Sequence, residues 1–188
     1  DGYTPKELTV QFVPSQNADT LEAKAKPLEK LLSKKLGIPV KVSVSTNYNT
    51  IVEAMKSKKV DVGFLPPTAY TLAHDQKAAD LLLQAQRYGV NKDGSSNKKL
   101  VDDYKSEILV KKNSGIKSLK DLKGKKIALQ DVTSTAGYTF PLATLKKETG
   151  INATKDMKIV NVKGHDQAVI SLLNGDVDAA AVFQDART

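Results

Sequence analysis

The sequence contains no cysteine, no tryptophan and only two histidines among its 188 residues. The absence of cysteine excludes disulfides, thiolate metal sites and cysteine nucleophiles. No apolar run approaches the roughly 20 residues that a membrane-spanning helix needs. The chain opens with the polar stretch DGYTPKE, which is typical of a mature exported protein and equally of a cytosolic one. With 40% hydrophobic and 27% charged residues, the composition is that of an ordinary globular chain of one or two domains.

Arginine is also scarce, although the chain is strongly basic. The net charge is +8 and the pI is about 9.4, yet Arg87 and Arg187 are the only arginines. Such a balance favours anionic partners in general. Proteins that read nucleic acid usually rely on arginine side chains, whereas the lysines here are scattered in short groups such as KSKK and KGKK. We therefore expect no nucleic-acid partner and consider anionic small molecules instead.

Strands and helices are predicted to alternate along the chain. Apolar patterning predicts strands at residues 7–14, 38–45, 60–66, 80–88, 104–112, 125–130, 157–164 and 176–183. Helical spacing predicts helices at residues 18–37, 47–59, 67–76, 136–150 and 165–175, with a helical turn at 118–124. The polar, glycine-containing stretch at 91–103 predicts a loop. This alternation predicts an α/β fold with largely parallel sheets.

Two parts of the chain repeat one design. EAMKSKKVDVGFL and SLLNGDVDAAAVF each contain a helix end, a short turn, a Val-Asp pair and a strand, so that Val60–Asp61 corresponds to Val177–Asp178. The repeat favours two similarly built α/β lobes that meet near the polar stretch. A single doubly wound sheet is the alternative. We expect Asp61 and Asp178 to be structural acids at strand starts.

Parallel α/β sheets bind ligands beyond the carboxyl ends of their strands, so the residues at those positions are the candidates for a site. They are mostly uncharged hydrogen-bonding residues: Tyr48, Thr68, Thr133, Ser134, Thr135, His165, Gln184 and Asp185, with Tyr104 opening the strand after the polar stretch. Structural roles are the alternatives: Tyr48 as a packed aromatic, His165 as a helix cap or surface residue, and Asp185 as a loop acid.

The segment DVTSTAGYTF combines three consecutive hydroxyl residues with the start of a predicted helix. Helix capping explains one hydroxyl, at Thr133 or Ser134, but not three. The amino terminus of a helix carries unpaired N–H groups and a partial positive charge. The segment is therefore predicted to hold an anion.

Motifs of known enzyme classes are absent. The chain has no Gly-x-x-x-x-Gly-Lys-Ser/Thr loop, no Gly-x-Gly-x-x-Gly, no Gly-x-Ser-x-Gly and no His-Glu-x-x-His. The two histidines and scattered acids show no metal-ligand spacing, so no metal or cofactor is expected. Ser134, His165 and Asp185 have the residue types of a Ser-His-Asp arrangement, which keeps a hydrolase open as an alternative.

Three segments, residues 17–70, 122–145 and 163–187, resemble the phosphate, phosphite and phosphonate substrate-binding proteins of ABC transporters, which have the type II periplasmic-binding-protein fold. The resemblance covers nearly the whole chain in order and rests on their combination, since LKGKKIA alone occurs widely among two-lobed receptors. It implies two α/β lobes with a phosphorus–oxygen group bound in the cleft between them.

The resemblance also implies the ligand-binding residues. Tyrosines of the family match Tyr48 and Tyr104, its Ser-Thr-Ser-Gly turn matches Ser134, Thr135, Ala136 and Gly137, its histidine matches His165, and its acid matches Asp185. Thr68 and Thr133 complete the expected set. Ala136 departs from the family's last serine, which removes one hydroxyl but keeps the backbone N–H.

Members of the family continue past the point where this sequence stops, so the chain resembles a fragment of such a receptor. Residues 1–103 would form the N-terminal part of lobe one, 104–182 lobe two, and 183–188 the start of the return crossing. The implied function is an extracytoplasmic receptor, periplasmic or a cell-surface lipoprotein whose anchor lies outside this sequence. It would deliver its anion to an ABC permease without catalysis. A Ser/His-dependent phosphoester hydrolase and a sensor domain of the same fold are the alternatives.

Overall fold

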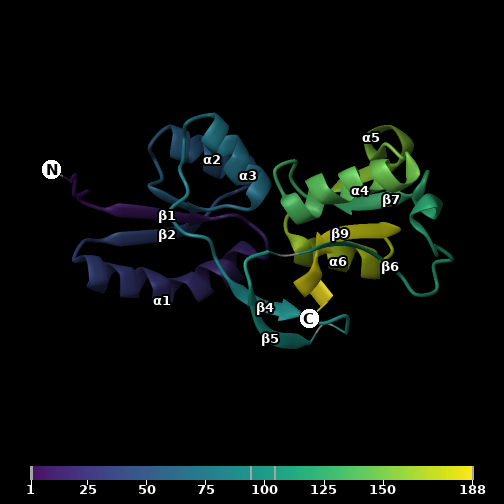
Figure 1. The fold of residues 1–188 in the computed structure, drawn as a ribbon, viewed down its shortest axis with the longest axis horizontal. Coiled ribbons are helices and arrows are strands. Elements are labelled where there is room, and N and C mark those ends of the chain that lie inside the picture. The colour runs from purple at the N-terminus through teal and green to yellow at the C-terminus, as the bar shows by residue number, and fades with distance from the viewer. Residues whose placement is uncertain (1, 94, 104, 188) are drawn as a thin grey trace. The chain divides into compact units, whose positions relative to one another are not determined.

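A computed structural model describes residues 2–93, 95–103 and 105–187, without the side chains of residues 185 and 187. The chain divides into two compact units, Asp1–Asp80 and Leu81–Thr188, each with its own sheet and core (Figure 1). Within the described residues, no helix is both long and apolar enough to cross a membrane. The predicted lobe boundaries at residues 103 and 182 stay predictions.

The first unit is built on a three-stranded parallel sheet in the order β2-β1-β3. Its elements are β1 (Leu8–Phe12), α1 (Ala18–Leu36), β2 (Val40–Val44), α2 (Tyr48–Lys56), β3 (Val62–Phe64) and α3 (Pro67–Asp75). Ala25 of α1 packs with Val10, Val40 and Val42 on one face of the sheet. A second cluster, centred on Ile51, joins α2 to α3. The ribbon places α1 on one side of β1 and β2, and α2 and α3 on the other (Figure 1).

The second unit holds a four-stranded sheet in the order β6-β9-β7-β8. β7 runs parallel to both β8 and β9, while the edge strand β6 is antiparallel to β9. The elements are β6 (Ser106–Val110), η1 (Leu119–Leu122), β7 (Lys126–Leu129), η2 (Thr135–Thr139), α4 (Phe140–Thr149), α5 (Ala153–Asp156), β8 (Lys158–Asn161), α6 (His165–Leu173), β9 (Ala179–Phe183) and η3 (Gln184–Arg187).

Helices cover both faces of this second sheet. Ile127 and Leu129 of β7 face a cluster that contains Leu145 of α4 and Ala153 of α5. Ala128, between them in the sequence, faces the opposite cluster with residues of α6. Side chains alternate between the faces of a strand, so a strand buried on both sides has no solvated face. Ligands can therefore approach this sheet at the ends of its strands.

The predicted fold class is confirmed, because helices and strands alternate and parallel pairing dominates the two larger sheets. The end of α1 was also predicted correctly, since Gly37 caps it in the left-handed conformation with φ +70°. The helix predicted at 136–150 begins instead with the π-helical turn η2, and the one-turn helix α5 was not predicted.

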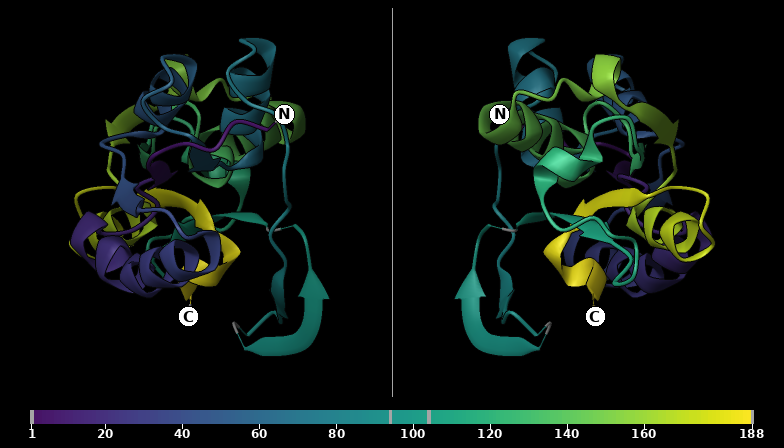
Figure 2. Two further views of the ribbon diagram at one scale, coloured as in Figure 1. Left: turned by 90° about the vertical axis from the view of Figure 1, so that its left-hand side faces the viewer. Right: turned by 90° about the vertical axis from the view of Figure 1, so that its right-hand side faces the viewer.

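Two predictions around the polar stretch were wrong. The strand expected at 80–88 is absent over Leu81, Leu82 and Leu83, which are 62%, 79% and 85% exposed, and β4 begins only at Arg87 and ends at Val90. The loop expected at 91–103 contains β5 (Ser96–Val101), which pairs antiparallel with β4 as a separate ribbon (Figure 2). Backbone pairing in an exposed hairpin needs no apolar periodicity, so the pattern could not reveal it.

The strand expected to be buried at 60–66 is shorter and less buried than predicted. β3 covers three residues, and Phe64 is 43% exposed. Its ring stacks on Phe12 of β1 with centroids 4.4 Å apart. The two stacked rings therefore shield part of each other from water at the surface of the sheet.

The repeated Val-Asp pairs occupy equivalent positions in the two units. Asp61 Oδ2 accepts hydrogen bonds from the backbone N–H of Thr9 (2.8 Å) and from its hydroxyl (2.9 Å). Asp178 Oδ2 accepts one from the backbone N–H of Lys126 (2.9 Å). Each acid thereby ties the start of its own strand to the neighbouring parallel strand, and the predicted structural role of both is confirmed.

Replacing Asp178 by alanine should lower the free energy of unfolding by roughly 1–2 kcal/mol, because the N–H of Lys126 loses a charged acceptor. Urea unfolding followed by circular dichroism measures the change. Asp176→Ala is the matched control, since it removes the same charge two residues earlier. Equal losses in the two variants would show that net charge, rather than the hydrogen bond, is responsible.

Candidate anion-binding site

The candidate site lies at the carboxyl end of β7, where the chain turns into η2 and α4. We call residues 133–137 the hydroxyl turn. Asp131 shapes its entry, because Oδ1 accepts hydrogen bonds from the backbone N–H of Thr133 (3.1 Å) and from its hydroxyl (2.9 Å). The Thr133 proton is thus used within the turn, and this residue sets the shape of the turn.

Ser134 caps the π-helical turn. Its Oγ accepts a hydrogen bond from the backbone N–H of Gly137 (3.2 Å), and its carbonyl accepts from the N–H groups of Tyr138 and Thr139. A hydroxyl that accepts in this way still has its own proton to donate. Ser134, Thr135 and Ala136 are each 1% exposed, so the middle of the hydroxyl turn is buried.

His165 is the first residue of α6 and follows β8. The residue is 6% exposed, and its ring packs against Phe183 with centroids 4.3 Å apart. Nδ1 lies 2.7 Å from Nε2 of Gln130 and accepts from the backbone N–H of Phe183 at 3.2 Å. The helix cap is Gly164, so His165 is neither a cap nor a surface residue. Burial lowers the pKa of His165 from 6.5 to about 4, so the ring is neutral at pH 7.

Gln130 connects His165 to the hydroxyl turn, and the sequence analysis missed it. It is 1% exposed, and its backbone N–H donates to the carbonyl of Gly137 (3.0 Å). A Cβ at residue 137 would collide with the Gln130 amide, 2.7 Å from its Cδ, and would lie 2.8 Å from Ser134 Oγ. Glycine at this position therefore makes room for the amide. The available signal was a polar residue that ends the buried strand KKIALQ.

Topology assembles these groups at one edge. The hydroxyl turn follows β7, His165 follows β8, and residue 185 follows β9, and these strands are adjacent and parallel. Their carboxyl ends therefore meet at the same edge of the sheet. Ser106 of β6 adds a link, because its hydroxyl donates to the carbonyl of Ala136 (2.7 Å).

This geometry tests the ligand-binding role of none of the predicted site residues, and the remaining ones lie elsewhere in the chain. Tyr48 opens α2 in the first unit, is 3% exposed and follows the cap Asn47, whose Oδ1 accepts from the N–H of Thr50. Thr68 is a half-buried residue of α3 in the same unit. Tyr104 and the side chain of Asp185 lie outside the described part of the structure. Their roles as ligand-binding residues stay predictions.

The geometry around His165 differs from that of a Ser-His-Asp triad. In such a triad the histidine donates from Nδ1 to a carboxylate. Here the backbone N–H of Phe183 points at Nδ1, which therefore acts as an acceptor. The arrangement gives no support to the hydrolase alternative.

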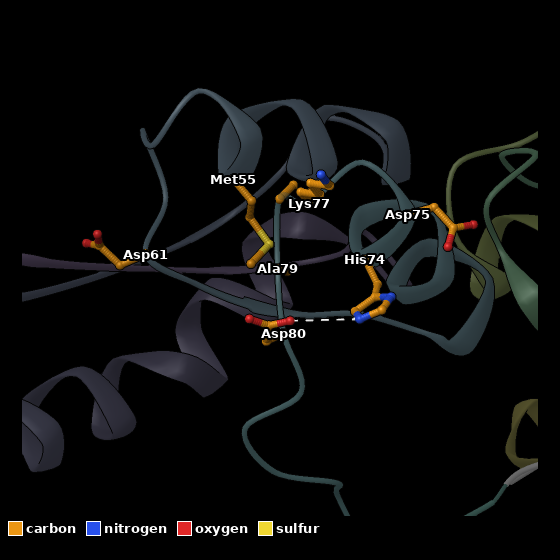
Figure 3. A pocket seen from close by; sticks show the side chains of 8 residues that line it. Met55, Asp61, His74, Asp75, Lys77, Ala79 and Asp80 are labelled. Atoms are coloured by element: carbon orange, nitrogen blue, oxygen red, sulfur yellow. Dashed lines mark ion pairs between the residues drawn. The ribbon is translucent and has the colours of Figure 1, made fainter.

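A surface hollow in the first unit has the wrong chemistry for an anion. Three acids, Asp61, Asp75 and Asp80, and one lysine line it (Figure 3). Asp80 lies 3.8 Å from Nε2 of His74. Among the described residues, no group of three or more histidine or acidic side chains is arranged to hold a metal ion.

The depressed pKa of His165 makes stability depend on pH. The unfolded chain takes up the histidine proton below about pH 6.5, whereas the folded chain does so only near pH 4. The free energy of unfolding should therefore fall as the pH drops from 6.5 to 4, by up to about 3 kcal/mol. Urea unfolding at pH 7 and pH 5 measures the first part of this loss.

The histidine variants provide the control for this experiment. His165→Asn should reduce the loss between pH 7 and pH 5, while His74→Asn should preserve it, because His74 is exposed. The same pH dependence in wild type and His165→Asn would contradict the assignment.

Comparison with known proteins gives the family of this chain. A family model described as "ABC transporter, phosphonate, periplasmic substrate-binding protein" matches residues 10–188. The phosphate-import protein PhnD of Mycolicibacterium smegmatis is 31% identical over 186 residues, which cover 95% of this chain and 56% of that protein. The probable phosphite-binding protein PhnD1 of Prochlorococcus marinus is 29% identical, over 95% of this chain and 58% of that protein.

Solved structures agree with the family match. The structure of PhnD1 from Prochlorococcus marinus in complex with methylphosphonate superposes with a TM-score of 0.75 at 25% identity, covering 95% of this chain and 64% of that one. A binding protein of a phosphonate transporter from Pseudomonas aeruginosa has a TM-score of 0.77 at 21% identity, over 96% and 58% of the two chains. The chain spans about half the length of the curated relatives it matches. It belongs to the family of phosphonate-type periplasmic substrate-binding proteins of ABC transporters.

Proposed function

We propose that the protein captures a small phosphorus oxyanion, a phosphonate, phosphite or phosphate, and delivers it to an ABC importer without chemical change. The observation that carries the proposal is the buried hydroxyl turn at a helix start, beside a neutral histidine. Relatives named for phosphate, phosphite and phosphonate support the ligand class.

The hydroxyl turn offers directed donors in place of a cationic clamp. Ser134 keeps a proton to donate while its oxygen caps the turn. The hydroxyl of Thr135 and the backbone N–H of Ala136 come next, where the helix carries its partial positive charge. Ala136 lacks the hydroxyl of the family's last serine, so this position contributes through its backbone alone.

Asp185 would select ligands that carry a proton or a positively charged group. A carboxylate near a bound anion is unfavourable unless the ligand brings a positive or protonated group, because like charges repel. A P–OH group can donate to a carboxylate in a charge-assisted hydrogen bond, and an aminoalkylphosphonate can offer an ammonium group. Sulfate has neither at neutral pH, so it should be rejected.

The proposed partner is an ABC permease, and the proposed location is outside the cytoplasm, as the names of the periplasmic relatives suggest. A permease that recognises the loaded receptor requires a conformation that the ligand stabilises. A lipid anchor stays a prediction, and no further partner is proposed.

Replacing Ser134 or Thr135 by alanine should weaken binding by roughly 1–3 kcal/mol, the usual scale for a hydrogen bond to a charged group. Calorimetric titration with phosphate, phosphite and methylphosphonate measures the loss. Thr154→Ala is the control, because that exposed hydroxyl lies on α5, before β8 begins. Ser134 also caps η2, so its replacement can lower stability as well as affinity. Urea unfolding of each variant measures the change in stability separately. Release of phosphate from a phosphate ester, abolished by Ser134→Ala, would contradict binding without turnover.

Replacing Asp185 by asparagine should reduce the difference between the protein's affinity for its phosphorus oxyanion and its affinity for sulfate. The amide keeps the shape of the carboxylate, removes its charge and adds a donor for an unprotonated oxygen. Calorimetry of wild type and variant with sulfate, phosphite, methylphosphonate and 2-aminoethylphosphonate gives the preference order. An unchanged order with unchanged affinities would place Asp185 outside the site.

A further inference from the structure

We propose that Gln130 is a positioning residue that, together with the backbone N–H of Phe183, holds His165 as the tautomer with its hydrogen on Nε2, so that the histidine presents a permanent donor to the bound oxyanion. The role of the donor rests on the proposed function. The tautomer itself rests only on the contacts of the two side chains.

Two groups converge on Nδ1 of His165. The side-chain nitrogen of Gln130 lies 2.7 Å away, and the backbone nitrogen of Phe183 lies 3.2 Å away. The backbone N–H can only donate, so Nδ1 must offer a lone pair to it. A neutral imidazole with a lone pair on Nδ1 carries its hydrogen on Nε2.

The same contact fixes the orientation of the Gln130 amide. With its oxygen and nitrogen exchanged, an acceptor would lie 2.7 Å from Nδ1 and would require a hydrogen there. That hydrogen would compete with the N–H of Phe183 for the same side of the ring. The geometry therefore requires the amide to donate, although its oxygen then accepts no hydrogen bond from the described residues.

The surroundings hold the amide in this place. Gln130 is 1% exposed, its backbone N–H is bonded to the carbonyl of Gly137, and its side chain occupies the space that a Cβ at residue 137 would fill. The hydroxyl turn and the histidine are thus set by one side chain. A shift of the amide would disturb both parts of the site together.

Nitrogen NMR of the histidine side chains tests the tautomer directly. The full chain is labelled with ¹⁵N-histidine, and a long-range ¹H–¹⁵N spectrum is recorded at pH 7 without ligand. The chain has two histidines, so His74→Asn assigns the spectrum. We expect His165 to show a protonated Nε2 and an unprotonated Nδ1. A protonated Nδ1 in the wild type, in a neutral or charged ring, would overturn the proposal, and this measurement needs no variant at the site.

Two variants test the part played by Gln130. Gln130→Glu offers only acceptors at pH 7, so we expect the Nδ1 resonance to move towards the protonated position. The methionine side chain of Gln130→Met has a similar length but no N–H group to donate to Nδ1, so we expect a mixture of the two tautomers of His165. Gln167→Glu on α6 makes the same chemical change at an exposed residue and should leave His165 unchanged. Wild-type spectra for both Gln130 variants would show that Phe183 alone sets the tautomer and would overturn the proposal.

A ligand titration links the tautomer to binding. Methylphosphonate and inorganic phosphate, added to the wild type, should shift the Nε2 resonance of His165, and Gln130→Met should weaken their binding roughly tenfold, the scale of one hydrogen bond. Binding without a shift at Nε2 would overturn the role of this donor. Failure of both probes to bind the wild type would contradict the proposed function, and the ligand-free spectra would then decide the tautomer alone.

Discussion

The parallel pairing of β7 with β8 on one side and β9 on the other is the constraint on which the candidate site depends. Three adjacent strands that run the same way deliver their following segments to one edge of the sheet. Helices α4 and α5 close one face and α6 closes the other, so this edge stays available for polar groups. The opposite edge serves stability, with Asp178 tying β9 to β7.

At the carboxyl edge of this sheet, buried polar groups are linked by hydrogen bonds. Ser134 satisfies the N–H of Gly137, and Gln130 reaches from the end of β7 to His165. Hydrogen bonds between buried polar groups favour one arrangement, because a buried donor that loses its acceptor costs about 1–3 kcal/mol. A site preorganised in this way suits the capture of an anion by directed donors, since little has to reorganise on binding.

Both units use the same device at the opposite edge. The acid of each Val-Asp pair bonds to the backbone of a neighbouring parallel strand, at Thr9 in one unit and at Lys126 in the other. The sequence repeat that suggested two similar lobes thus has a physical basis in strand pairing. The polar stretch, which belongs to the second unit, was harder to predict, because an exposed hairpin such as β4–β5 is held by backbone hydrogen bonds that leave no pattern in the side chains.

The sequence by itself determined the alternation of strands and helices, the end of α1 at Gly37 and the position of the hydroxyl turn, because these depend on local periodicity, capping and backbone preference. Only the tertiary structure decided the role of Gln130. Its side chain meets His165 from 35 positions away, and no local pattern encodes such a contact. The burial that keeps His165 neutral and the N–H of Phe183 that makes its Nδ1 an acceptor likewise come from tertiary packing, which depends on how β8 and β9 flank β7.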